Sequence, residues 1–354
     1  MAQHQAAFLD GEGKPLRVGP IATKKPGVGE VLVRAAAVAI NPVDWKIQAH
    51  ASFIPQWPIV LGEDVAGEIV EVGEGVRAGL AKGQRVILHS TFLVSQKIEQ
   101  GGFQELVVAP QASVAVLPDA VRYEDAVALP LAVSTAAAGL FQPPAEGLGL
   151  DLPTPAGEGE EKKKKKSGKT LLLWGASSSV GAATIQLAVA AGYDVVATAS
   201  PRNFGLARAL GARAVFDYSS PSVVADLVAE LKGGDFAGAY DAISTRETQL
   251  ATAQVVQQLG GGSLAVVIPP ETDGGNEGFP ETVSKKHILC LTIFAKYPEV
   301  GKAVWQDYLP EALKTGQFKP TPPPEVVGKG LGSLQSAFDK QKAGVSAKKI
   351  VVTL

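Results

Sequence analysis

Short hydrophobic runs alternate with glycine-containing turns over the first third of the chain, with turn glycines such as Gly73, Gly75, Gly101 and Gly102. Runs of this length and composition between turn residues predict β-strands. Because few helical patterns interrupt them, we expect a compact, barrel-like β domain. The predicted strands are EVLVRAAAVAIN (30–41), GEIVEVGEGV (67–76), QRVILHS (84–90), FQELVVA (103–109) and SVAVLP (113–118).

From about Thr170 the pattern changes to apolar runs separated by stretches with helical spacing. Strands connected through helices run parallel and are joined by right-handed crossovers. We therefore expect a doubly wound parallel sheet in this part of the chain. The predicted strands are 170–174, 193–199, 213–218, 238–243 and 263–268, and the predicted helices are 179–191, 202–210, 220–231 and 247–259.

After about Thr282 the pattern resembles the first third again. We expect this tail to return to the β domain, so that the domain with the parallel sheet is inserted into it. The predicted elements are a strand in HILCLTIF (287–294), helices near 298–315 and 329–342, and a last strand in KKIVVTL (348–354). The expected domains are 1–126 with 296–354, and 127–295.

Residues 143–169 are rich in Pro, Gly, Glu and Lys and include a five-lysine run, Lys162–Lys166. A segment of this composition cannot bury enough apolar surface to become ordered. The lysine run could be a docking or localisation patch, but Glu158, Glu160 and Glu161 partly cancel its charge. We interpret the segment as a flexible, solvated insert without a catalytic role.

The composition narrows the possible function classes. A chain of 354 residues with 46% hydrophobic residues is large enough for two cores, and a formal charge of −2 gives no indication of nucleic acid or an anionic membrane as partner. No apolar run reaches the roughly 18–20 residues of a membrane span, and Met1–Asp10 lacks the features of a signal peptide. We expect a cytoplasmic protein. The single cysteine, Cys290, excludes an internal disulfide, and its apolar neighbours predict a buried strand position.

The stretch LLLWGASSSVGAATIQLA (171–188) predicts a strand, a tight turn and a helix. A helix N-terminus presents unsatisfied N–H groups and a partial positive charge, which together bind phosphate. Gly175 ends the strand, and Gly181 lies where a side chain would hold the helix away from the sheet. The turn residues replace glycines with hydroxyl donors, so we predict a dinucleotide pyrophosphate site. Its residues are Ser177, Ser178, Ser179 and Val180.

The end of the second strand, ATASPRN (197–203), indicates which dinucleotide binds. NAD sites usually have an acidic residue there, for the ribose 2′-hydroxyl. In this chain Asp194 lies at the opposite end of the strand, whereas Ser200 and Arg202 follow its last residue. A hydroxyl beside a guanidinium suits a 2′-phosphate, and Tyr218 could add a second hydroxyl. We therefore predict NADP.

Several motifs together resemble the zinc-free medium-chain dehydrogenase/reductases, most closely the trans-acting enoyl reductases of fungal polyketide pathways. The resemblance covers nearly the whole chain and implies a GroES-like β domain carrying a Rossmann domain, with the active site between them. The motifs are AINPVDWK (39–46), LGEDVAGEIVEVG (61–73), GGFQELVVAP (101–110), ALPLAVSTAAAGL (128–140), WGASSSVGAATIQLA (174–188), ATASPRNF (197–204) and LGARAVFDY (210–218).

Zinc-containing members of the superfamily place cysteine, histidine and glutamate where this chain has residues 41–44 and 62–64, and they carry a cysteine-rich lobe that is absent here. A catalytic zinc needs three protein ligands. The four histidines, His4, His50, His89 and His287, are scattered and expected to be unpaired, so no metal is predicted. The lysine that quinone oxidoreductases use for the 2′-phosphate is replaced by Asn203, which leaves that role to Arg202.

Without a metal, conjugate reduction of an activated C=C bond is easier than alcohol oxidation, because the acceptor delocalises the developing charge. The resemblance places Asn41 beside the nicotinamide. Lys46 and Thr135 are our candidates for orienting cofactor or substrate, although Lys46 could be a surface lysine and Thr135 a helix cap. We assign Ser244 and Thr245 to the nicotinamide ribose and the Ile268 backbone to the carboxamide.

The predicted function is NADPH-dependent reduction of an enoyl thioester or enone. The substrate is a small molecule or a carrier-bound acyl chain, a polyketide synthase is a possible partner, and the protein is a monomer or homodimer. Two alternatives remain, an NADPH quinone oxidoreductase and a non-catalytic NADPH-binding homologue.

Overall fold

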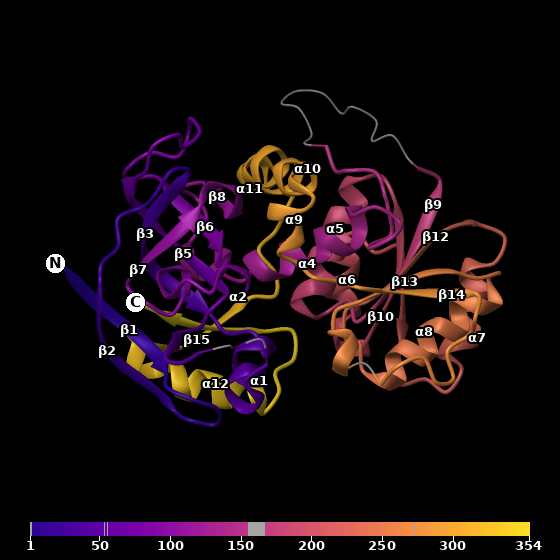
Figure 1. Cartoon of the computed structure of the whole chain (residues 1–354). Helices are drawn as coiled ribbons and strands as arrows, with labels where there is room; N and C mark the ends of the chain where they lie inside the picture. The colour runs from indigo at the N-terminus through magenta and orange to yellow at the C-terminus, as the bar shows by residue number, and fades with distance from the viewer. Residues whose placement is uncertain (1, 53, 55, 155–166, 273) are drawn as a thin grey trace. The chain divides into compact units, whose positions relative to one another are not determined.

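The computed structural model describes residues 2–52, 54, 56–154, 167–272 and 274–354 (Figure 1). The chain divides into two compact units, of which the first contains Met1–Leu131 and Leu309–Leu354 and the second contains Ala132–Tyr308. The first boundary therefore lies five residues after the predicted 126/127 boundary, and the second thirteen residues after the predicted 295/296 boundary.

The first unit contains two β-sheets. In the larger sheet the strand order is β15-β16-β3-β5-β6-β8, and β7 pairs with β3. The smaller sheet has the order β2-β1-β4. The strands are β1 (Gln3–Leu9), β2 (Leu16–Ala22), β3 (Glu30–Ala39), β4 (Ile59–Val60), β5 (Asp64–Val72), β6 (Arg85–His89), β7 (Leu106–Pro110), β8 (Val114–Val116), β15 (Pro324–Lys329) and β16 (Lys349–Thr353). The helices are α1 (Pro42–His50), α2 (Phe92–Ser95), α3 (Tyr123–Ala126), the start of α4 (Pro130–Phe141), α11 (Leu309–Thr315) and α12 (Leu334–Lys342).

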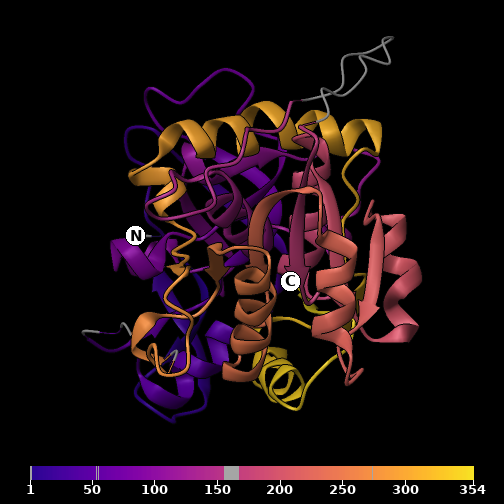
Figure 2. The same ribbon diagram turned by 90° about the vertical axis from the view of Figure 1, so that its right-hand side faces the viewer.

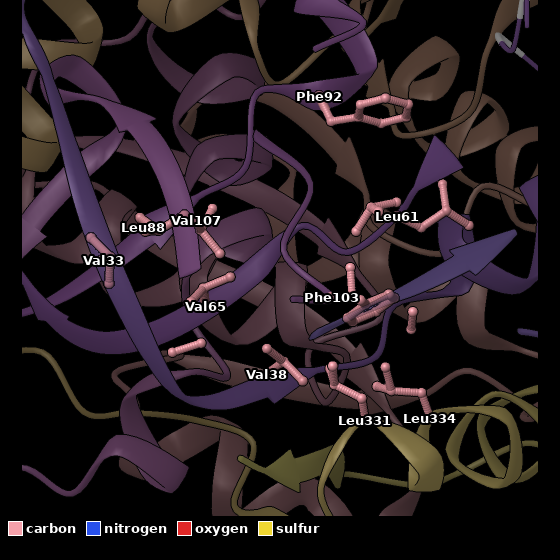
Figure 3. Close-up of a cluster of buried hydrophobic side chains, with 14 of the residues drawn as sticks. Val33, Val38, Leu61, Val65, Leu88, Phe92, Phe103, Val107, Leu331 and Leu334 are labelled. Carbon is pink, nitrogen blue, oxygen red and sulfur yellow. The ribbon is translucent and has the colours of Figure 1, made fainter. Parts of the chain in front are cut away.

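Both ends of the chain contribute to the core of the first unit (Figure 3). Valines and leucines from β3, β5, β6 and β7 pack with Leu331 and Leu334 from the C-terminal segment. The rings of Phe103 and Phe338 lie 5.6 Å apart between centroids. Because these side chains are almost completely buried, the C-terminal segment is part of the first unit and stabilises it by apolar burial.

The second unit is built on a six-stranded parallel sheet with the order β11-β10-β9-β12-β13-β14. Its strands are β9 (Lys169–Trp174), β10 (Asp194–Ala199), β11 (Ala214–Asp217), β12 (Asp235–Asp241), β13 (Gly262–Val266) and β14 (Val283–His287). Its helices are the rest of α4, α5 (Ser179–Ala190), α6 (Phe204–Ala209), α7 (Val223–Leu231), α8 (Arg246–Gln258), α9 (Thr292–Ala295), α10 (Pro298–Gly301) and a π-helical segment, Lys302–Tyr308.

Helices cover both faces of this parallel sheet (Figures 1 and 2). The strand order runs outward from β9 in both directions, and right-handed crossovers put the helices of the two halves on opposite faces. This arrangement is a Rossmann-type doubly wound sheet, in which ligands bind at the carboxyl ends of the strands. The predicted fold class is confirmed.

Two predicted elements near the C-terminus are wrong or displaced. The predicted strand at 287–294 is wrong, because the strand is β14, whose polar residues suit a sheet edge. Cys290 follows that strand and is half-buried rather than buried. The helix predicted near 329–342 begins only at Leu334, since the preceding residues form β15 and a short 3₁₀ turn. β1 and β2 were not predicted at all.

The insert was predicted to be unstructured throughout, and its first part is not. The Leu148 amide donates to Gly139 O and the Leu150 amide to Leu140 O, which fastens this part to the end of α4. Leu148 is also buried. The lysine run Lys162–Lys166 lies outside the described residues.

One helical stretch within the described residues, Tyr123–Phe141, is long and apolar enough to cross a membrane by length and composition. Of its apolar window, 83% is buried inside the protein. Burial of this kind is expected of a core helix, which passes the same test of length and composition.

Candidate active site

The turn between β9 and α5 is shaped by two glycines and a serine cap. Gly175 has φ +89°, and a Cβ on Gly181 would lie 2.2 Å from the Gly175 carbonyl oxygen. The Ser178 hydroxyl caps α5, because it accepts from the Gly181 amide and donates to the Gly175 carbonyl, each at 2.9 Å. That hydroxyl is thus used within the turn. The half-buried Ser177, Ser179 and Val180 complete the turn at the N-terminus of α5.

The ends of β10 and β11 lie side by side in the sheet. Ala199 pairs with Asp217, so the next residues, Ser200 and Tyr218, follow at the same carboxyl edge. The Ser200 hydroxyl accepts from the Asn203 amide group at 3.1 Å, Arg202 is exposed, and Tyr218 is 50% exposed.

Two acidic residues in these strands bear on the choice of dinucleotide. Asp194 begins β10 and is exposed, so it lies at the opposite end of that strand. The Asp217 carboxylate at the end of β11 accepts from the backbone and hydroxyl of Ser219. The residues that directly follow β10 are therefore a hydroxyl, a proline and a guanidinium, without an acid.

Asp241 at the end of β12 is a polar residue that sequence reasoning missed. It is fully buried, and this burial raises the pKa of its carboxyl to about 6, although bonds from Thr248 and from the Ser244 and Ile243 amides oppose the shift. Ser244 has φ +58°, and its hydroxyl donates to Asp241 O at 2.7 Å and accepts from Val267 N at 2.9 Å. Ser244 therefore connects the ends of β12 and β13.

Three further predicted residues of the second unit have structural contacts. Thr245 caps α8 by accepting from Thr248 N. The Ile268 carbonyl lies 3.1 Å from His287 Nδ1, so this carbonyl is a partner of the imidazole. Thr135 lies inside α4, not at a cap, and its carbonyl accepts from the Tyr240 hydroxyl at 2.8 Å.

Lys46 lies on α1 in the first unit and is exposed. Its ammonium is 5.9 Å from the centroid of the Trp45 ring, a distance at which a cation–π contact is weak. An exposed ammonium with this one weak contact agrees with the alternative that Lys46 is a surface lysine.

Asn41, by contrast, belongs to a buried polar cluster in the first unit that we call the Asn41 cluster, made of Asn41, Asp64 and Lys349. Each of these residues is at most 4% exposed. Asn41 Nδ2 donates to Asp64 Oδ2 at 2.7 Å, Lys349 Nζ donates to Asn41 Oδ1 at 2.5 Å, and Lys349 Nζ lies 2.7 Å from Asp64 Oδ2. Of the three, only Asn41 was predicted. Asp64 and Lys349 could have been found from one signal in the sequence, since each is a charged residue at the start of an apolar strand.

Sheet register explains why these residues meet. Ala39 of β3 pairs with Asp64 of β5, and Asp64 pairs with His89 of β6. On the other side of β3, Val351 pairs with Ala39, and the antiparallel register places Lys349 opposite Asn41. Four segments that are distant in the chain therefore bring polar side chains to one end of the sheet.

Two more buried carboxyl groups lie beside the Asn41 cluster. His89 Nε2 is 3.3 Å from Glu63 Oε2, which corrects the expectation that the histidines are unpaired. Burial, reinforced by the Asp64 carboxylate, raises the pKa of Glu63 to about 8. Burial is also the main cause that raises the pKa of Asp44 well above its ordinary value, and the nearby Glu63 carboxyl adds to the shift. Both carboxyl groups therefore favour their protonated forms.

These residues do not fit a zinc ion. Within the part of the chain that the structure describes, no group of three or more His, Cys, Asp or Glu side chains has an arrangement suited to a metal. The Asp64 carboxylate is already paired with the Lys349 ammonium, and a second cation at that oxygen would be repelled.

A nucleotide-binding parallel sheet together with a β unit assembled from both ends of the chain defines a class of two-domain oxidoreductases. Residues 27–119 match the alcohol dehydrogenase GroES-like domain, and residues 179–281 match the zinc-binding dehydrogenase domain. The chain belongs to the medium-chain dehydrogenase/reductase family, and its homologues are fungal trans-enoyl reductases and dehydrogenases. The predicted resemblance is confirmed.

Two relatives match over nearly their full length. The dehydrogenase orsE of Emericella nidulans is 38% identical, with 100% of each chain covered. The trans-enoyl reductase himH of Aspergillus japonicus is 39% identical, with 96% of this chain and 94% of that protein covered.

Among solved structures, a putative zinc-dependent alcohol dehydrogenase from Rhizobium etli has a TM-score of 0.79 at 22% identity, covering 100% of this chain and 99% of that one. CurK enoyl reductase has a TM-score of 0.72 at 21% identity, covering 99% of each chain. At these identities the similarity shows the fold alone.

Proposed function

We propose that this protein is an NADPH-dependent reductase of activated C=C bonds in enoyl thioesters or enones. The observation that carries the proposal is the carboxyl edge of β9, β10 and β11, with a glycine turn for pyrophosphate and no acid directly after β10. The relatives named trans-enoyl reductases support this reaction over others of the family, since himH and tndF are 39% and 34% identical to the chain.

The choice of NADPH over NADH rests on Ser200 and Arg202. A 2′-phosphate gains charge-assisted hydrogen bonds from a guanidinium, whereas an NAD site would place a carboxylate on the 2′-hydroxyl. Arg202 is exposed at this edge and Ser200 lies beside it. A mycobacterial protein solved in complex with NADPH has the same fold, with a TM-score of 0.69 at 22% identity.

In the proposed reaction the reduced nicotinamide supplies a hydride to the β-carbon of the substrate. Negative charge then collects on the carbonyl oxygen, and this oxygen needs hydrogen-bond donors. We assign that role to the Asn41 amide, with Lys46 and Thr135 as further candidates for orienting cofactor or substrate. The α-carbon takes its proton from water or a side chain.

Activity is proposed to be independent of zinc. The Asn41 cluster holds an amide, a carboxylate and an ammonium in contact with one another, and this set lacks the thiolate and imidazole ligands of a catalytic zinc. Chelation should accordingly leave turnover intact.

We further infer that the substrate is carried by a partner synthase. The support is that three relatives, himH, tndF of Aspergillus flavipes and tazE of Aspergillus terreus, are each named trans-enoyl reductases. A cytoplasmic location agrees with this role.

The test is the transfer of deuterium from labelled NADPH to an α,β-unsaturated thioester. We expect the label on the β-carbon of the saturated product. Label on a carbinol carbon would identify a ketone reductase instead. Turnover of 1,4-naphthoquinone with every enoyl substrate inert would identify a quinone reductase, and no turnover at all would favour a non-catalytic binding protein.

A further inference from the structure

Lys349 is a charged side chain in the interior of the first unit. It is 3% exposed and begins β16, whereas its neighbour Lys348 is exposed. Burying an ammonium is costly unless it is paired and hydrogen-bonded. Here the cost is offset by the Asp64 carboxylate and the Asn41 carbonyl oxygen, which both lie within hydrogen-bond distance of Nζ.

These two contacts give the Asn41 amide a single orientation. Its oxygen faces a cation and its nitrogen faces a carboxylate, so rotating the amide by half a turn would place like against like. A residue with less constrained neighbours could adopt both orientations. The direction of the remaining Asn41 N–H is therefore set by Lys349 and Asp64 together.

One N–H of the Asn41 amide remains available. Nδ2 carries two hydrogens, one of which is donated to Asp64, and the second has no acceptor among the residues that the structure describes. The ammonium at the amide oxygen and the carboxylate at the first N–H act on the electron density of the nitrogen in opposite senses. What the two charged partners fix is therefore the direction of the available N–H.

Asp64 is itself held in place by more than Lys349. Its other oxygen accepts from the backbone N–H of Leu131 at 2.6 Å, in the first turn of α4. A carboxylate at a helix N-terminus is stabilised by the unsatisfied amides there. The carboxylate thus has fixed partners on both oxygens, and the orientation it imposes on Asn41 is correspondingly fixed.

We propose that Lys349 is a positioning residue for the reduction, which orients the Asn41 amide so that its available N–H stabilises the developing charge on the substrate carbonyl oxygen. The proposal rests on the proposed function and adds to it a residue from the opposite end of the chain. Lys349 itself does not touch the reacting atoms.

The first experiment compares steady-state kinetics of four proteins: wild type, K349M/D64N, N41A and K348M. The double variant removes both charges and so avoids leaving one of them unpaired in the interior. We expect kcat to fall roughly tenfold or more in K349M/D64N and about 100-fold in N41A, the scale of weakening or losing an oxyanion donor. The Kd for NADPH should change little, and K348M should match wild type.

A kcat of K349M/D64N within about threefold of wild type, in a folded protein, would overturn the role assigned to Lys349. Wild-type protein that reduces no enoyl thioester would instead count against the proposed function. The two failures are therefore distinguishable, because only the second concerns the unmodified protein.

A second measurement does not depend on activity or on the variants folding. The chain has three asparagines, Asn41, Asn203 and Asn276, so selective ¹⁵N labelling of asparagine side chains gives three resolvable amide groups. In the wild type, we expect the Asn41 amide protons to exchange slowly with solvent and to have chemical shifts well separated from those of the exposed Asn276, the internal reference. An Asn41 amide with the chemical shifts and the exchange rate of Asn276 would contradict the fixed orientation and with it the proposal.

Discussion

The nucleotide edge of the second unit and the Asn41 cluster of the first are both polar, but they are built in different ways. The edge is formed largely by one continuous stretch, from Trp174 to Asn203, in which turns and helix starts expose backbone groups. The Asn41 cluster joins side chains from β16, β5 and the start of α1, with Lys349 and Asn41 separated by 308 positions. Local backbone geometry is enough to place polar groups at the ends of strands. A buried ion pair forms only when the whole sheet brings its two residues together.

The largest expected effect concerns the ion pair of the Asn41 cluster. Lys349→Met should lower the free energy of unfolding by about 3–5 kcal/mol, because it leaves the Asp64 carboxylate buried without its cation. The measurement is urea denaturation. K349M/D64N should recover much of the loss, and Lys348→Met should be close to wild type. Equal stability of K349M and wild type would mean that Asp64 gains little from its partner.

At the nucleotide edge the structure depends on close approaches between backbone atoms, which only glycine permits. Gly181→Ala should destabilise by up to about 3 kcal/mol, since its Cβ would lie 2.2 Å from the Gly175 carbonyl oxygen and must push α5 away. NADPH binding, followed by fluorescence titration, should weaken with it. Gly205→Ala is the matched control, because α6 leaves open space there and alanine favours a helix. An unaffected Gly181→Ala protein would show that the turn can relax.

Arg202→Ala tests the same edge by removing a charge, whereas Gly181→Ala changes the shape of the turn. We expect NADPH to bind about 2 kcal/mol more weakly, roughly thirtyfold in Kd, because one charge-assisted contact is lost. NADH affinity should hardly change, and Arg208→Ala on α6 should leave both unchanged. Equal affinity of the unmodified protein for NADPH and NADH would refute the choice of dinucleotide.

The smallest effect, counted per pH unit, is the pH dependence of the free energy of unfolding that Glu63 contributes. The folded pKa of about 8 lies above the ordinary 4.5, so the folded protein holds this proton more tightly than the unfolded chain does. The contribution to stability is full below about pH 4.5 and is lost as the pH rises to about 8, with a slope near −1.4 kcal/mol per pH unit. Glu63→Gln should flatten this slope, and Glu68→Gln on the exposed face of β5 should not.

Local patterns allowed much of the second unit to be predicted. The strand, turn and helix around Gly175 and Gly181 follow from apolar runs and glycines within a few residues of each other, and β9, α5 and β10 lie within one residue of their predicted bounds or slightly inside them. The errors fall where the pattern is weak. The polar edge strand β14 was mistaken for the apolar run that follows it.

The roles of single side chains were harder to predict from the sequence. Ser178 and Ser244 were assigned to the cofactor, yet their hydroxyls bond to the backbone of the strand ends. Hydroxyl groups beside a turn have local acceptors within reach, and these compete with any ligand. The sequence predicted the turn, but it could not show which serine hydroxyl forms hydrogen bonds within that turn.

The sequence by itself determined the two kinds of domain, their order along the chain and the strand, turn and helix around Gly175 and Gly181, because periodicity and turn residues act over short distances. Only the tertiary structure decided that Lys349, Asp64 and Asn41 meet, that Glu63 faces His89, and that Asp241 is buried. Strand register sets these contacts, and register results from packing the whole sheet. A charged residue in an apolar strand shows in the sequence that it needs a partner, but not which one.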